Sequence, residues 1–135
     1  MTPSLYTVLV VEDYPAMRPL LCQVLAQCPC RVLVAASSAE AIATIEQHDG
    51  PVHLLLVDLN QPDLSGPVLT ALVRALCPGV RALHLCGSCL TVQSKGDDDL
   101  CLPKPFRVSD LVDKVLELLR GSEPKAMAER CDSAV

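Results

Sequence analysis

The sequence predicts an α/β fold built on a parallel sheet, and two patterns carry that prediction. Short apolar runs rich in β-branched residues alternate along the chain with segments whose apolar residues recur at helical spacing. The first and third runs are almost continuously apolar, which is typical of strands that are covered on both faces. Strand and helix therefore alternate through the whole chain, as in a parallel sheet with right-handed crossover connections.

Five runs are predicted to be strands, because each is apolar and short enough for a strand. They span residues 6–11, 31–35, 52–57, 81–85 and 100–102. The chain has 135 residues, a length that fits one compact domain, so all five strands are expected in one sheet.

Four segments are predicted to be helices, at residues 16–26, 38–47, 67–76 and 108–119. Pro19 is expected to delay the start of the first, because proline is tolerated only in the first turn. Ser38 is the expected cap of the second. The last has the clearest apolar stripe, formed by Leu111, Val112, Val115, Leu118 and Leu119.

Two segments depart from this alternation. Residues 87–99 contain few apolar residues and end in Asp97-Asp98-Asp99, so at most a short helix at residues 90–94 is expected between the fourth and fifth strands. The chain after Leu119 is polar and rich in small residues. We therefore predict a domain over residues 5–120 followed by a polar tail over 121–135.

The composition excludes several classes of protein. Half of the residues are hydrophobic, which excludes disorder of the whole chain, and only 2% are aromatic, so the core must be aliphatic. The formal charge of -5 gives no general affinity for nucleic acid or an anionic membrane. No apolar run has the length of a membrane span, and the start shows no signal peptide. These features predict a cytoplasmic protein.

Eight cysteines raise the question of disulfides or zinc. A disulfide framework is disfavoured, because the aliphatic core is large and no export signal is visible. Cys28-x-Cys30 and Cys86-x-x-Cys89 each resemble half of a zinc site, but no Cys/His pair follows at finger-like spacing. We interpret the cysteines as small hydrophobic residues in a reducing compartment.

Residues with reactive or charged side chains stand where four of the predicted strands end. Glu12 and Asp13 follow the first strand, Asp58 the third, Cys86 the fourth, and Lys104 comes after the fifth. In an open α/β sheet ligands bind at the carboxyl ends of the strands. Three carboxylates placed together repel one another unless a cation joins them, and such oxygen ligands suit magnesium. A lysine beside them suits a transferred phosphoryl oxygen.

These motifs together resemble the receiver domains of two-component response regulators, the CheY-like family. The resemblance covers about residues 5–120, and the residues that carry it are Glu12-Asp13, Asp58 with Pro62 and Gly66, and Lys104-Pro105-Phe106. It implies a flavodoxin-like, doubly wound five-stranded parallel sheet with strand order 2-1-3-4-5 and a shortened fourth helix.

The resemblance also implies a role for each matching residue. Asp58 corresponds to the phosphoacceptor, which takes a phosphoryl group from a sensor histidine kinase or a phosphotransfer protein. Glu12, Asp13, Asp58 and the backbone carbonyl of Asn60 correspond to the Mg²⁺ ligands, and Lys104 to the residue that pairs with Asp58 or its phosphoryl group. Such a domain is regulatory rather than an enzyme, with at most slow self-phosphorylation from small phosphodonors and autodephosphorylation.

The sequence departs from the family pattern in its switch region. Cys86 stands where the family usually has Thr or Ser, and Cys101 where it usually has Tyr or Phe. The stretch from Cys86 to Lys104 is shorter than usual by about one helical turn. A thiol is a weak hydrogen-bond donor, so we expect the phosphorylation chemistry to be retained and the signal readout to be altered.

Two other readings stay open. The first is a pseudo-receiver, an interaction module that works without phosphate, and the second is a thiol-based redox or metal sensor that uses Cys86 and Cys89. His48, His53 and His84 are interpreted as structural, because none has the exposed helical position of a phosphotransfer histidine. The expected downstream partner is a protein of unknown identity, with neither direct nucleic-acid nor membrane binding. The chain is a stand-alone regulator, a relay intermediate or a receiver from a longer protein.

Overall fold

A computed structural model describes residues 6–48, 50–58, 66–86, 99–103 and 106–121, and of Asp58, Cys86 and Cys101 it describes the backbone alone. All five predicted strands and four predicted helices are present, with ends within two residues of those expected. In chain order the elements are β1 Tyr6–Val11, α1 Met17–Leu25, β2 Cys30–Ala35, α2 Ser38–Gln47, β3 Leu54–Asp58, α3 Gly66–Leu76, β4 Arg81–Cys86, β5 Asp99–Pro103 and α4 Val108–Gly121.

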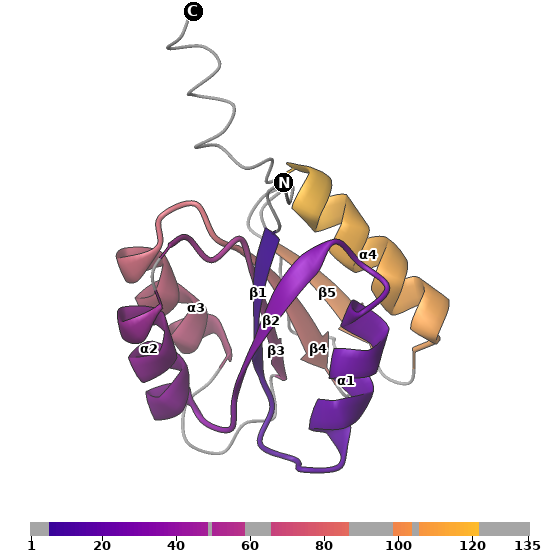
Figure 1. Ribbon diagram of the computed structural model, residues 1–135, viewed down its shortest axis with the longest axis horizontal. Coiled ribbons are helices and arrows are strands. Elements are labelled where there is room, and N and C mark those ends of the chain that lie inside the picture. Colours follow the sequence, from indigo (N-terminus) through magenta and orange to yellow (C-terminus); the bar gives the residue numbers. More distant parts are fainter. Residues whose placement is uncertain (1–5, 49, 59–65, 87–98, 104–105, 122–135) are drawn as a thin grey trace, which may run out of the picture.

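The strands form one parallel sheet in the order β2-β1-β3-β4-β5, which confirms the predicted order. Helices α1 and α4 cover one face of this sheet, and α2 and α3 cover the other (Figure 1). The doubly wound α/β class is therefore confirmed. Each helix returns the chain from the carboxyl edge of the sheet to its amino edge, so the loops that follow the strands meet at one edge.

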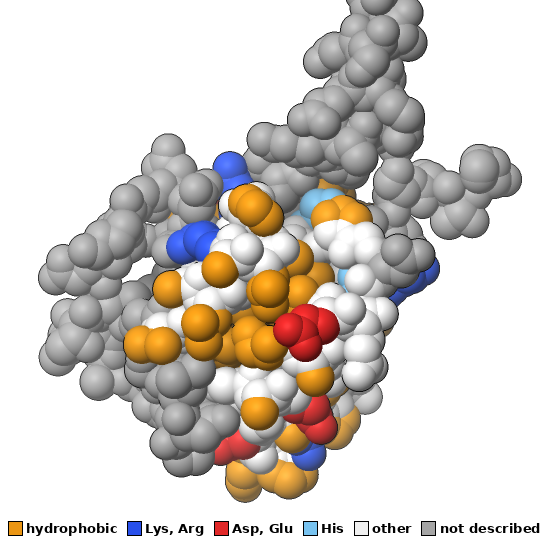
Figure 2. All heavy atoms as spheres, turned by 90° about the vertical axis from the view of Figure 1, so that its left-hand side faces the viewer, with side chains coloured by type: hydrophobic (Ala, Val, Ile, Leu, Met, Phe, Trp, Pro, Cys, Tyr) orange, Lys and Arg blue, Asp and Glu red, His pale blue; other side chains and the backbone are white. Residues whose placement is uncertain are grey.

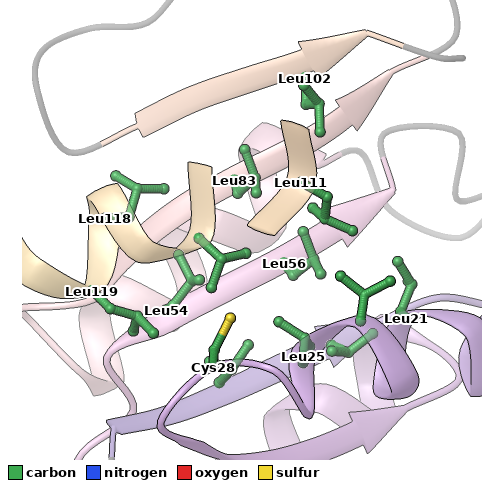
Figure 3. Close-up of a cluster of buried hydrophobic side chains, with 14 of the residues drawn as sticks. Leu21, Leu25, Cys28, Leu54, Leu56, Leu83, Leu102, Leu111, Leu118 and Leu119 are labelled. Carbon is green, nitrogen blue, oxygen red and sulfur yellow. The ribbon is translucent and has the colours of Figure 1, made fainter. Parts of the chain in front are cut away.

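Two apolar clusters hold these layers together, one on each face of the sheet. Val8 and Val10 of β1 belong to the cluster beneath α1 and α4, and Leu9 and Val11 to the cluster beneath α2 and α3. The continuous apolar run of the first strand thus serves both faces. Figure 3 shows the first cluster, where leucines of α1 and α4 meet leucines of β3 and β4. The buried apolar side chains described are all aliphatic or Cys, as the composition predicts.

The starts of two helices differ from the prediction. Helix α1 begins at Met17, so Pro19 does not delay it. Pro19 lies in the first turn, where a backbone N–H has no partner within the helix and its loss costs little. The cap of α2 is Ser37, whose Oγ accepts a hydrogen bond from the Glu40 N–H at 3.1 Å, and Ser38 is the first helical residue. Glu40 in turn accepts from the N–H of Ala36.

The segment before β5 also differs in part. Asp99 was expected in the loop, but it begins β5 and pairs with Ala82 of β4. The short helix predicted at residues 90–94 lies outside the described residues, so α4 here is the helix that follows β5. The tail beyond Gly121 also lies outside them and stays a prediction. No described helix has both the length and the apolar character needed to span a bilayer.

Candidate functional site

The strand register brings the predicted site positions to one edge of the sheet. Val11 of β1 pairs with Val57 of β3, so the next residues, Glu12 and Asp58, leave adjacent strands at the same level. Asp58 pairs with Leu85 of β4, immediately before Cys86. Neighbouring strands are about 4.8 Å apart, so the backbones of these positions form a short row along the carboxyl edge.

The row continues onto β5. Cys86 pairs with Pro103, the last residue of β5. Lys104 follows Pro103 in the chain and lies outside the described residues, as does Asn60. The register thus confirms that the four strand ends singled out in the sequence lie at one edge. The side-chain geometry of Asp58, Cys86, Asn60 and Lys104 stays a prediction.

Glu12 is the buried acid of this edge, with 1% of its surface exposed. Its backbone N–H donates to the carbonyl of Ala35 at 3.1 Å, which extends the pairing of β1 and β2 by one residue. Its Oε2 accepts a hydrogen bond from the N–H of Tyr14 at 3.3 Å. A carboxylate is costly to bury unless it is hydrogen-bonded or joined to a cation, and the Tyr14 N–H supplies one such hydrogen bond.

Asp13 and its neighbours form the exposed part of the same loop. Asp13 is exposed, and Tyr14, directly after it, has 61% of its surface exposed. Arg18 of α1 donates from Nη1 to the backbone carbonyl of Glu12 at 3.2 Å and so ties the helix to the acidic loop. Sequence reasoning did not single out Arg18. The signal for it was a basic residue just inside the helix that follows an acidic strand end.

The described part of the edge fits the oxygen chemistry of a magnesium site. Of the predicted ligands, Glu12 and Asp13 have described side chains, one buried and one exposed. Mg²⁺ keeps several waters and takes few carboxylates, so a buried acid beside an exposed one suits it. Within the described residues no group of three or more His, Cys, Asp or Glu side chains could hold a metal ion. The other predicted ligands, Asp58 and Asn60, stay predictions.

The described cysteines lack the features of a reactive site. Cys22, Cys28, Cys30 and Cys77 are free thiols. Burial raises the pKa of Cys28, and burial together with the neighbouring Cys28 raises the pKa of Cys30 to about 11. The Cys30 thiol donates to the carbonyl of Leu25 at 3.5 Å. Because thiolate is the reactive form, both groups are poor nucleophiles and poor metal ligands at neutral pH. The structure does not describe the side chain of Cys86, and Cys89 lies outside the described residues.

The three histidines lie in or beside the fold's regular elements. His48 is the C-cap residue that follows α2, and its N–H donates to the carbonyls of Thr44 and Ile45. His84 lies within β4 with 4% of its surface exposed. His53 stands just before β3, and its Nδ1 accepts the N–H of Thr7 at 2.9 Å. These placements support the structural role expected for them.

Comparison with known proteins decides the family. The model of the response regulator receiver domain matches residues 8–116, a span that contains β2 to β5 and most of α4. The chain belongs to the response regulator receiver domain family. Receiver domains are the regulatory domains of two-component signal transduction, and the family is not one of enzymes in the ordinary sense. As members of phosphorelays they interact with histidine kinases and downstream effectors, and they generally bind Mg²⁺ at the phosphorylation site.

Individual relatives agree with this assignment. The chain is 31% identical over 124 residues to the sensor kinase CckA of Brucella abortus (strain 2308), covering 87% of this chain and 13% of the kinase. It is 28% identical over 124 residues to the transcription factor SKN7 of Saccharomyces cerevisiae, covering 88% of this chain and 20% of that protein. The receiver domain described here thus spans a small part of either curated relative.

A solved receiver domain has the same fold. The crystal structure of a response regulator receiver domain protein (CheY-like) from Methanospirillum hungatei JF-1 matches with a TM-score of 0.74 and 28% identity. The match covers 90% of this chain and 99% of that one. The CheY-like fold expected from the sequence is thereby confirmed.

Proposed function

We propose that this receiver domain accepts a phosphoryl group on Asp58 and then changes its contacts with a downstream protein. The observation that carries the proposal is the register, because it places the end of β3 between the acidic end of β1 and the end of β4. Asp58 is the acid at the centre of that row. The donor is a phosphohistidine on a sensor histidine kinase or a phosphotransfer protein.

The transfer step needs little covalent chemistry from the domain. An Oδ atom of Asp58 attacks the phosphorus, and the bond between phosphorus and the donor's imidazole nitrogen breaks. The nitrogen keeps the electron pair, and Asp58 becomes an acyl phosphate. Lys104 supplies a positive charge for the transferred phosphoryl oxygens. Catalysis is therefore mainly a matter of position and charge.

The acids around Asp58 have separate roles in this proposal. Asp13 would hold Mg²⁺ directly and Glu12 would hold it through water, with Asp58 and the Asn60 backbone carbonyl as the other protein ligands. The exposure of Asp13 and the burial of Glu12 support this division. When bound, Mg²⁺ would neutralise negative charge on the phosphoryl group. The hydrogen bond from Tyr14 N–H to Glu12 Oε2 holds the Glu12 carboxylate in place.

Partner docking is the other half of the function. Tyr14 and Leu20 have 61% and 53% of their surfaces exposed, beside the acidic loop and on α1. Exposed aromatic and aliphatic residues near a reactive edge suit a protein donor better than a small molecule. We place the domain in the cytoplasm, where ATP-dependent kinases make phosphohistidine, and we assign it no direct nucleic-acid or membrane contact.

The test is phosphate uptake followed by intact-mass measurement. The purified chain is incubated with acetyl phosphate and Mg²⁺, and we expect one added phosphate, which the Asp58→Asn variant should lack. Asp113→Asn, which removes an exposed acid on α4, is the matched control and should take up phosphate as the unaltered protein does. Uptake at an undiminished rate by Asp58→Asn would refute the assignment.

A phosphate-independent pseudo-receiver is the second candidate, and the two cysteines at the switch positions favour it. Cys86 occupies the last position of β4, and Cys101 lies in β5 beside His84. The same uptake experiment separates the candidates, since a pseudo-receiver takes up no phosphate. If phosphate is taken up, Cys86→Thr should strengthen the conformational response to a beryllofluoride mimic, because a hydroxyl is the better donor.

A thiol-based sensor is disfavoured for the part of the chain that is described. The raised pKa of Cys30 and the burial of Cys28 leave that pair unreactive. A sensor would have to use Cys86 and Cys89. Thiol titration and metal analysis of the purified protein test it, and full titration of all thiols with no bound metal would remove this reading.

A further inference from the structure

Helix α3 has an exposed face that carries no charge. Its exposed residues with described side chains are all apolar: Val68, Ala71, Leu72, Ala75 and Leu76. Val68, Leu72 and Leu76 have 48%, 45% and 44% of their surfaces exposed, and their spacing of four places them along one side of the helix. A surface helix normally carries polar residues there.

Helix α4 shows what the ordinary pattern looks like in the same protein. After Val108 at its start, its exposed residues are polar or charged, and they are Ser109, Asp110, Asp113, Glu117 and Arg120. Both helices bury one side against the sheet. The exposed apolar side of α3 is therefore a local property of this helix and not of the fold's helices in general.

Helix α2 extends the apolar surface beside α3. The two helices pack against each other on the same face of the sheet. Ala39 and Ala43 are exposed on α2, and Figure 2 shows hydrophobic side chains gathered across the centre of the face that α2 and α3 form. We name as the α2–α3 surface the residues Ala39, Ala43, Val68, Ala71, Leu72, Ala75 and Leu76. Its alanines allow another backbone to approach closely, and its larger residues supply contact area.

Acidic side chains accompany this surface. Glu40 and Glu46 are exposed on α2, and neither makes an ion pair within the described residues. The basic residue of α3, Arg74, donates from Nε to the carbonyl of Val80 at 3.2 Å and so serves the loop that leads into β4. The exposed charges that α2 contributes beside this surface are therefore negative.

We propose that the α2–α3 surface binds an amphipathic helix of another protein, with an apolar stripe flanked by Lys or Arg. Such a helix meets the apolar residues with its stripe and the acids of α2 with its basic flank. An anionic membrane is a poor occupant, because it would face the same acids.

A second copy of this chain is also a poor occupant. Standard interfaces use about 20–30 residues on each side, whereas this surface offers three large apolar side chains. A dimer would also bring together two surfaces that both carry acids, within chains of net charge -5. A single short helix requires less area and supplies the missing positive charge.

The test uses two labelled synthetic helices with the same leucine stripe, one with Lys on its flank and one with Glu. Fluorescence anisotropy of each peptide is measured with the full chain. We expect the Lys peptide to bind better than the Glu peptide. Leu72→Gln should weaken binding of the Lys peptide by at least about tenfold, because half of the Leu72 side chain is available for burial. Glu46→Gln should reduce the preference for the Lys peptide.

Val108→Gln is the matched control, since Val108 on α4 is 53% exposed and α4 lies on the opposite face of the sheet. It should leave peptide binding unchanged, and the melting temperatures of all variants establish that they fold. Equal binding of the two peptides, or binding that Leu72→Gln leaves intact, would overturn the proposal. A dimer in sedimentation that Leu72→Gln dissociates would overturn it in favour of self-association. The test does not depend on phosphorylation of Asp58, so it fails or succeeds separately from the proposed function.

Discussion

The two edges of the sheet each hold an ionisable side chain next to β1, and they use it in opposite ways. At the amino edge, His53 closes the hydrogen bonding of the backbone. Its N–H donates to the carbonyl of Thr7 at 2.9 Å, its Nδ1 accepts the Thr7 N–H at 2.9 Å, and its carbonyl accepts the N–H of Arg81 at 3.0 Å. Its ring meets Tyr6 edge to face, with centroids 5.4 Å apart.

At the carboxyl edge, Glu12 is buried more deeply, and its side chain also accepts a hydrogen bond from a backbone N–H. Its Oε2 accepts one N–H, from Tyr14, at the longer distance of 3.3 Å. A neutral imidazole that completes a sheet adds stability, whereas in the proposed site a buried carboxylate next to other acids would reduce stability until a cation binds. The comparison teaches that burial alone does not distinguish a structural group from a functional one. The hydrogen bonds and the charge of the neighbours do.

The largest effect is expected from Asp13→Asn. This change removes the exposed carboxylate proposed as a direct Mg²⁺ ligand, so the rise in melting temperature on adding Mg²⁺ should disappear. Without metal the variant should be at least as stable as the unaltered protein, because one of the mutually repelling acids is gone. Thermal melts with and without Mg²⁺ measure both effects, and a full Mg²⁺ shift in the variant would exclude Asp13 as a ligand.

Glu12→Gln tests whether the buried acid is functional. The amide keeps an oxygen that can accept the Tyr14 N–H, so we expect little loss of stability. Phosphate uptake from acetyl phosphate should fall by about 10- to 100-fold, the range for residues that act on a metal through its outer shell. Initial rates at saturating Mg²⁺ measure it. A variant that is unstable but takes up phosphate normally would make Glu12 a structural residue like His53.

His53→Ala tests the amino edge. The change leaves the Thr7 N–H without its acceptor in a place where Thr7 is only 6% exposed, which should cost about 1–3 kcal/mol of unfolding free energy. His53→Asn should restore most of that stability, since its side-chain oxygen can take the place of Nδ1. Urea denaturation gives both values, and phosphate uptake by the folded variants should not change. If phosphate uptake falls with His53→Asn, the two edges are coupled and His53 is not a purely structural residue.

The smallest effect is the pH dependence that His53 brings. Burial lowers the pKa of His53 below its ordinary value of 6.5. Above pH 6.5 the folded and unfolded states are both neutral at this residue, and it adds no pH dependence. As the pH falls below 6.5, the unfolded state binds the proton first, so stability decreases until the lower folded pKa is reached. The unfolding free energy should therefore fall more between pH 7.5 and 5.5 in the unaltered protein than in His53→Asn. Equal losses would show that His53 titrates alike in both states.

The amino-acid sequence determined the order of the elements and which strand ends meet at the edge of the proposed site. Continuous apolar runs such as that of β1 require cover on both faces, and acids at strand ends must meet at one edge of a parallel sheet. The residue type alone did not determine which serine caps α2. Ser37 and Ser38 are equally good caps as residue types. Ser37 has an extended backbone, with φ -153° and ψ 169°, and this conformation allows its Oγ to accept a hydrogen bond from the Glu40 N–H.

Contacts between distant segments were decided by the tertiary structure alone. The bond between His53 and Thr7 joins residues 46 positions apart, and no local pattern marks it. In α3 the sequence shows one apolar helix with Leu69, Leu72 and Val73 alike in character. The fold buries Leu69 and Val73 against the sheet and leaves Leu72 at the surface. A helix with apolar residues on more than one side can bury only the side that meets the sheet, and which side that is depends on how the neighbouring strands and α2 hold it.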